Sequence, residues 1–75
     1  MRRRIKIDFA STTLDTAYAW VRDAETHSLI GSLTGHGTPP TQWRFDAITL
    51  GAPFFGDTLV SVLEAANLQA VDVSI

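Results

Sequence analysis

The chain has 75 residues, of which 45% are hydrophobic and 19% are charged, and this composition predicts one small, soluble domain over residues 1–75 rather than a disordered segment. The absence of cysteine excludes disulfides, thiolate metal ligands and cysteine nucleophiles, and it is compatible with the cytoplasmic location that we expect. The formal net charge is -2, but four of the six basic residues fall within the first six positions, so the rest of the chain is acidic.

Residues 4–9 are predicted to form a half-buried strand, because Ile5, Ile7 and Phe9 alternate with charged residues. The charges of this strand argue against an export segment. The chain also lacks the run of about 20 apolar residues that a transmembrane helix needs. We therefore expect no membrane partner.

Residues 16–27 can be interpreted either as a helix or as a hairpin. Apolar residues in this segment and just before it have the spacing of one face of a helix: Leu14, Ala17, Tyr18 and Val21. A helix capped by Ser11 or Thr12 is therefore the prediction. The alternative is a strand over residues 18–21 and a hairpin turn at residues 23–26, because Tyr, Trp and Val favour strands. The strand is disfavoured because it would have apolar side chains on both faces.

The middle of the chain predicts two strands that are separated by a loop. Residues 29–34 have the composition of a strand, and the glycines and prolines of residues 35–40 predict a loop. Residues 42–50 predict a second strand, with Trp43 and Phe45 on its core side.

A helix over residues 57–66 and a paired strand over residues 71–75 are predicted at the C-terminal end. The helix has an apolar stripe with helical spacing: Leu59, Val62, Leu63 and Ala66. Asp57 is suited to cap its start, and Asn67 is suited to the left-handed conformation that ends a helix.

This order of elements predicts an α+β fold, a small two-layer sandwich with a ferredoxin-like β-α-β-β-α-β arrangement and one antiparallel sheet. The alternative is a β-meander plus one helix and a C-terminal strand. In the ferredoxin-like arrangement two helices cover one face of the sheet, and these residues form the expected core: Ile5, Ile7, Phe9, Leu14, Tyr18, Val21, Leu29, Leu33, Phe45, Leu59, Leu63, Ala66, Val71 and Val73.

No catalytic, cofactor or metal site is predicted. His27 and His36 are the only histidines, and neither has a second ligand at the spacing of a zinc site. The glycines of residues 31–37 lack the Gly-Lys-Ser/Thr sequence of a phosphate-binding loop, and no local pattern assembles a catalytic triad. We therefore expect a protein that is not an enzyme and that uses no cofactor.

The first functional hypothesis is a protein-binding module with an acidic surface and two aromatic anchors. These residues would form the contact: Asp15, Trp20, Asp23, Glu25, Phe54 and Glu64. The partner would be a larger protein or complex with a basic surface. Such a module suits a phage or mobile-element inhibitor, of the anti-defence or anti-CRISPR type, that acts on a host nucleic-acid-processing complex.

Two further hypotheses are kept as alternatives. The chain could bind nucleic acid through an anion-binding set at its basic end: Arg2, Arg3, Arg4, Lys6 and Arg44. Against this, the open face of the sheet is expected to lack the aromatic pair that stacks on bases. The chain could also be a homo-oligomeric structural subunit, for example a homodimer that extends its sheet through an edge strand.

Overall fold

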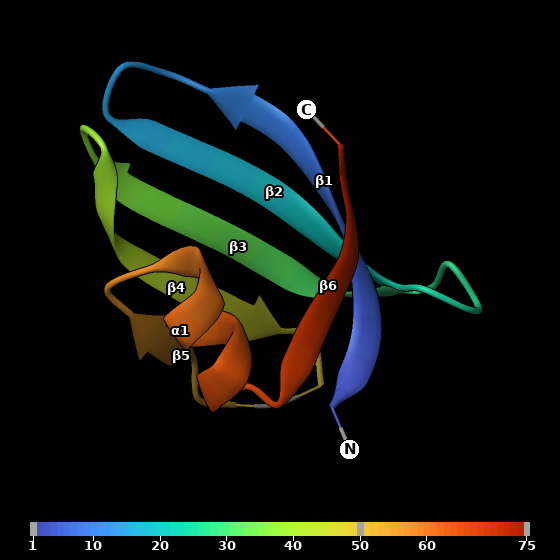
Figure 1. Cartoon of the computed structure of the whole chain (residues 1–75). Helices are drawn as coiled ribbons and strands as arrows, with labels where there is room; N and C mark the ends of the chain where they lie inside the picture. The colour runs from blue at the N-terminus through green and yellow to red at the C-terminus, as the bar shows by residue number, and fades with distance from the viewer. Residues whose placement is uncertain (1, 50, 75) are drawn as a thin grey trace.

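A computed structural model of the chain describes residues 2–49 and 51–74. The elements in these residues are β1 (Arg3–Thr12), β2 (Thr16–Asp23), β3 (Leu29–Gly37), β4 (Pro40–Ala47), β5 (Phe54–Gly56), α1 (Leu59–Ala65) and β6 (Leu68–Ser74). The strands form one sheet in the order β5-β4-β3-β2-β1-β6. Strand β6 runs parallel to β1, and the other neighbours are antiparallel. The fold is α+β, with the element order of the alternative prediction (Figure 1).

The ferredoxin-like prediction is wrong because residues 16–23 form strand β2 and not a helix. Strand β2 pairs with β1 on one side and with β3 on the other. This pairing satisfies its backbone groups, and it buries Ala19 and Val21 completely on the inner face of the sheet. The hairpin turn after Asp23, which the alternative interpretation placed at residues 23–26, is present. Tertiary pairing thus outweighs the helical spacing of the apolar residues.

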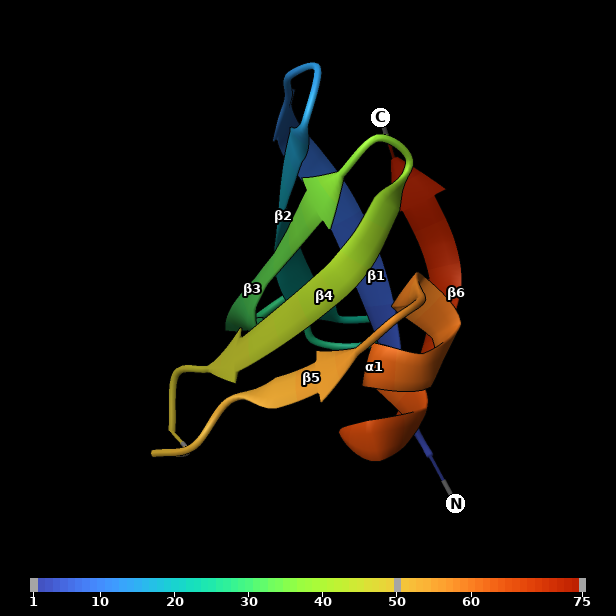
Figure 2. The same ribbon diagram turned by 90° about the vertical axis from the view of Figure 1, so that its left-hand side faces the viewer.

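The sheet curls, and α1 packs against its inner side (Figures 1 and 2). Val62 and Leu63 of α1 are buried against side chains from strands β1 to β4. The buried hydrophobic core consists of these residues: Ile5, Ile7, Ala17, Ala19, Val21, Leu33, Trp43, Phe45, Val62, Leu63 and Leu68. One side of the sheet therefore forms the core, and no described element covers the other side.

Two glycines of β3 let large aromatic rings lie directly on the strand. Gly35 of β3 is the register partner of Trp43 on β4, and Gly31 of β3 lies beside the ring of Phe45 on β4. A Cβ atom at Gly35 would stand 2.8 Å from ring atoms of Trp43, closer than normal van der Waals contact. The glycines thus make room for the two largest side chains of the core.

The ends of α1 confirm one prediction and correct another. Thr58, not Asp57, is the N-cap: its hydroxyl accepts a hydrogen bond from the backbone N–H of Ser61 at 3.0 Å, and the Ser61 hydroxyl accepts one from Thr58 at 3.1 Å. Asp57 instead accepts a hydrogen bond from the Ser61 hydroxyl. Asn67 has a φ of 58°, as predicted for the residue that ends the helix.

Other predicted boundaries and core positions differ from the structure. The predicted loop at residues 35–40 is shorter, because β3 continues to Gly37 and β4 begins at Pro40. The predicted strand over residues 42–50 ends at Ala47, and Leu50 lies outside the described residues. Some expected core residues lie outside the core. Leu14 is in a turn, Tyr18 is on the side of β2 that points away from the core, and Val71 and Val73 are on the edge strand β6.

Candidate functional site

The sheet face opposite α1, which we name the open face, carries three aromatic side chains. Tyr18 and Trp20 occupy alternate positions of β2, between the buried residues of the inner face. Their ring centroids are 5.2 Å apart in an edge-to-face arrangement with an interplanar angle of 89°. Phe55 of β5 lies on the same face and is 66% exposed, and Trp20 is 38% exposed. The open face therefore presents aromatic surface to solvent.

The register aligns polar residues with these aromatic rings. One row across the sheet runs from Tyr18 through Thr34 and Arg44 to Phe55. The guanidinium carbon of Arg44 lies 5.9 Å from the centroid of the Phe55 ring, within cation–π range. Arg44 Nε also donates to the carboxylate of Asp46 at 3.0 Å. These contacts hold Arg44 and Phe55 together at one end of the row.

The charges of the open face are almost balanced. Four cations and three anions lie on it: Arg4, Lys6, Arg22, Arg44, Asp8, Asp46 and Asp72. Arg22 is 3.8 Å from Asp8, and Lys6 lies between Arg22 and Asp72 in the strand register. The open face thus has about one net positive charge, although the whole chain has a net charge of -2.

The four acidic residues of the predicted contact surface are not brought together. Asp15 precedes β2 and Asp23 ends it, so the two lie roughly 25 Å apart at about 3.3 Å per residue. Glu25 is in the turn beside Asp23, and Glu64 is on α1. An acidic patch that includes all four residues is therefore not formed in this arrangement.

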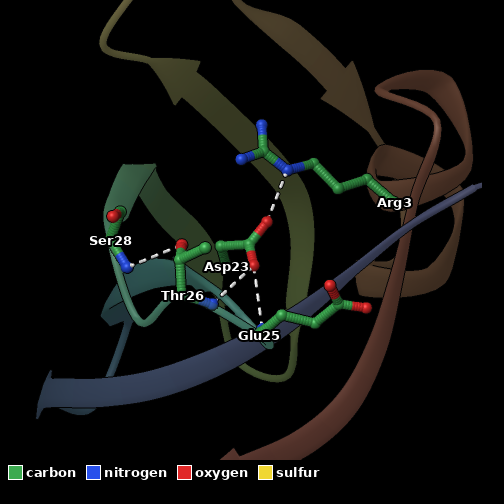
Figure 3. Close-up of polar contacts among 5 residues, drawn as sticks. All are labelled: Arg3, Asp23, Glu25, Thr26 and Ser28. Carbon is green, nitrogen blue, oxygen red and sulfur yellow. Dashed lines mark hydrogen bonds and ion pairs between the residues drawn. The ribbon is translucent and has the colours of Figure 1, made fainter.

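Asp23 has a structural role in the turn between β2 and β3 (Figure 3). Its Oδ1 accepts hydrogen bonds from the backbone N–H groups of Glu25 at 2.8 Å and Thr26 at 3.0 Å, and its Oδ2 accepts one from Arg3 Nε at 2.9 Å. The backbone N–H of Thr26, then that of Glu25 and then the Arg3 guanidinium lower the pKa of Asp23 to about 2. The Asp23 carboxylate is thus used by the turn and by the ion pair with Arg3.

The other basic residues of the N-terminal end differ in their contacts. Arg2 Nη1 donates to the backbone carbonyl of Leu68 at 3.4 Å. The side chains of Arg4 and Lys6 make no hydrogen bond or ion pair within the described residues. Of the predicted anion-binding set, Arg4, Lys6 and Arg44 therefore share the open face, and Arg3 is held by Asp23.

The two predicted aromatic anchors have different environments. Trp20 is on the open face, but Phe54 is half-buried and stacks on Phe45 of the core, with centroids 6.3 Å apart. Sequence reasoning did not select Tyr18 or Phe55 as site residues. For Tyr18 the available signal was the alternation of aromatic residues with Ala17 and Ala19, which is the pattern of a strand with two apolar faces.

Two of the hollows in the surface border strand β4. The first, of about 560 Å³, lies beside Phe55 where the short strand β5 ends. The second, of about 450 Å³, lies at the other end of β4 and has a mostly apolar wall with Arg3 at its side. Because Asp23 already holds Arg3, the first hollow, which is continuous with the open face, is the better candidate for a contact.

Within residues 2–49 and 51–74, no group of three or more His, Asp or Glu side chains could hold a metal ion, and no helix is long and apolar enough to cross a membrane. Comparisons with protein-family models, curated proteins and solved structures find no match. The open face is therefore the candidate functional site.

Proposed function

We propose that this chain is a non-enzymatic protein-binding module and that the open face is its contact surface. The observation that carries the proposal is the exposure of Trp20 and Phe55, with the half-buried Tyr18 beside Trp20, on a sheet face that no described element covers. Trp, Tyr and Arg are the residue types that most often dominate the binding energy of protein interfaces. The aromatic and arginine side chains of the open face match that composition.

The charge pattern also supports a protein partner. Arg22 and Arg44 have acidic neighbours on the open face, in Asp8 and Asp46. The face therefore has little excess charge to offer a polyanion, whereas polar groups around aromatic anchors are typical of protein interfaces. The open face replaces the acidic surface in the proposal, because Asp15 and Asp23 lie at opposite ends of β2.

The proposed biological role is that of an inhibitor of a larger complex. A chain of 75 residues can act on a larger complex by occupying one of its surfaces, as an inhibitor from a phage or mobile element would. A cytoplasmic location is proposed with it, since the chain has no cysteine and so does not depend on an oxidising compartment.

The test is a pull-down with the tagged chain from nuclease-treated lysate of the source cells, with mass spectrometry of the retained proteins. The wild type, Trp20→Ala and the control Leu14→Ala are compared, because Leu14 is 87% exposed but lies in the turn between β1 and β2 and not in a strand of the sheet. We expect a partner that wild type and Leu14→Ala retain and Trp20→Ala loses. Retention of the same proteins by all three variants, or of none by the wild type, would contradict the proposal.

Nucleic-acid binding is the second candidate, and the aromatic pair of β2 favours it. The expectation that the open face lacks such a pair is wrong, because Tyr18 and Trp20 stand there beside Arg22. Aromatic rings next to cations form the platforms that bind single strands. Fluorescence anisotropy with a labelled oligothymidylate tests this candidate. Binding that weakens steeply with salt and is lost in Trp20→Ala would favour nucleic acid over protein.

A further inference from the structure

Strand β4 has a free edge next to the hollow beside Phe55. The strand extends over Pro40–Ala47, but β5 pairs with it only from Trp43 to Phe45. Thr41 and Gln42 therefore have no strand partner on this side within the described residues, and both line the hollow. The residues that line the hollow place it next to Gly56, where β5 would continue if it were longer.

The backbone at this edge is suited to accept another strand. Gln42 pairs with His36 of β3 and Pro40 pairs with Gly37, so Thr41 is the extra residue of a bulge. The backbone groups of Thr41 therefore have no register partner on either neighbouring strand. An extended peptide that satisfied these groups would prolong the line of β5, which is the recognition mode known as β-strand addition.

The side chains around the hollow indicate which peptide would fit. Arg44 donates to the Asp46 carboxylate through Nε, so its two terminal nitrogens remain available as hydrogen-bond donors. The side chain of His36 has no hydrogen-bond partner within the described residues. A peptide residue opposite Gln42 would lie on the open face near these groups, where a carboxylate could be bound. Asp57 is also in the wall, but its carboxylate accepts a hydrogen bond from Ser61 at 3.1 Å.

The next peptide residue would point to the opposite side of the sheet, because side chains alternate along a strand. There it would lie on the inner side of the hollow, where Trp43, which is 8% exposed, is part of the lining. An apolar side chain fits this position. The required pattern is thus an acidic residue on the open face followed by an apolar residue on the inner face.

We propose that the partner of this module supplies an extended segment of alternating acidic and apolar residues that pairs with the free edge of β4. This inference rests on the proposed function, since it names the part of a protein partner that the module binds. The open face and the free edge would then form one continuous contact, with Phe55 between them.

The test uses the full ¹⁵N-labelled chain and an acetylated, amidated peptide of alternating glutamate and valine, followed by NMR. We expect shift changes at the amides of Thr41, Gln42 and their neighbours on β4 and β5. Arg44→Gln should weaken the affinity about tenfold, as expected for the loss of a charge-assisted hydrogen bond. Phe55→Ala should weaken it independently, and Leu14→Ala should not change it. A peptide N-methylated at alternate residues, which cannot form the ladder, should not bind.

Two results would overturn the inference. One is the absence of shift changes at β4 at the highest soluble peptide concentration. The other is binding that is centred on Trp20, or that is unchanged by N-methylation, because neither would depend on backbone pairing at Thr41 and Gln42. Either result leaves the protein-binding proposal intact, since the pull-down with Trp20→Ala tests it separately. Loss of the partner in that pull-down, with edge binding of the peptide preserved, would support both.

Discussion

Trp20 packs edge to face against Tyr18 on the open face, with 5.2 Å between the ring centroids. The two residues are neighbours on one side of β2, and the other side of the strand is buried. An aromatic pair of this kind restricts the rotamers of both rings before a partner arrives. A pre-arranged anchor loses less side-chain entropy on binding, which favours a contact at this position over one in a flexible loop.

The two tryptophans should respond differently to truncation. Trp20→Ala should lower the free energy of unfolding by about 1 kcal/mol or less, because Trp20 is 38% exposed on a face outside the core. Trp43→Ala should cost about 3 to 5 kcal/mol, since Trp43 is 8% exposed and packs over Gly35. Urea unfolding of both variants checks this. Equal losses would mean that Trp20 belongs to the core and is not free to serve as an anchor.

The close approach of Trp43 to β3 makes Gly35 sensitive to a single methyl group. Gly35→Ala should lower the free energy of unfolding by about 1 to 3 kcal/mol, because the new Cβ would lie 2.8 Å from the Trp43 ring. Gly51→Ala is the matched control, since nothing lies within 4 Å of a Cβ at that position. Thermal unfolding of the two variants measures the difference. A Gly35→Ala protein as stable as wild type would contradict the close packing of Trp43.

Much of the fold could be predicted from periodicity. The strands around Ile5 and Phe45 and the C-terminal helix were predicted from their spacing, and Asn67 was predicted to end that helix. These segments each have one apolar face and one polar face, so the period of the pattern identifies the element.

Strand β2 could not be predicted in the same way. Its inner face is apolar because it is buried, and its outer face is aromatic through Tyr18 and Trp20. The sequence alone disfavours a strand that is apolar on both faces and therefore favours the helical spacing. The two faces are apolar for different reasons, because only one of them packs in the core. The same feature that obscured the strand is the one that marks the candidate site.

The helix α1 offers a matched pair of valines. Val62 is fully buried against the inner face of the sheet, and Val60, two residues earlier, is 63% exposed. Val62→Ala should therefore lower the free energy of unfolding by about 2 kcal/mol, through two lost buried methyl groups and the cavity left behind. Val60→Ala should change it by about 0.5 kcal/mol or less. Urea unfolding measures both values, and a larger loss for Val60→Ala would contradict the placement of the helix.

The turn after β2 should make stability depend on pH through Asp23. The pKa of this carboxyl is lowered from 3.8 to about 2, chiefly by the backbone N–H groups of Thr26 and Glu25 and then by Arg3. A carboxyl with a lower pKa in the folded state stabilises that state above its unfolded pKa. The stabilising effect should therefore be complete above about pH 4 and should be lost as the pH falls from there toward 2.

Two measurements check the role of Asp23. An NMR titration of its carboxyl carbon should give a midpoint near 2, well below the usual range for aspartate. Unfolding experiments between pH 5 and pH 2 should show a smaller loss of stability for Asp23→Asn than for the wild type, because the amide does not titrate. Asp57→Asn is the control, since Asp57 accepts only the Ser61 hydroxyl. A midpoint near 3.8 for Asp23 would show that the turn and Arg3 do not hold the carboxylate as described, and Arg3 would then be free to take part in binding.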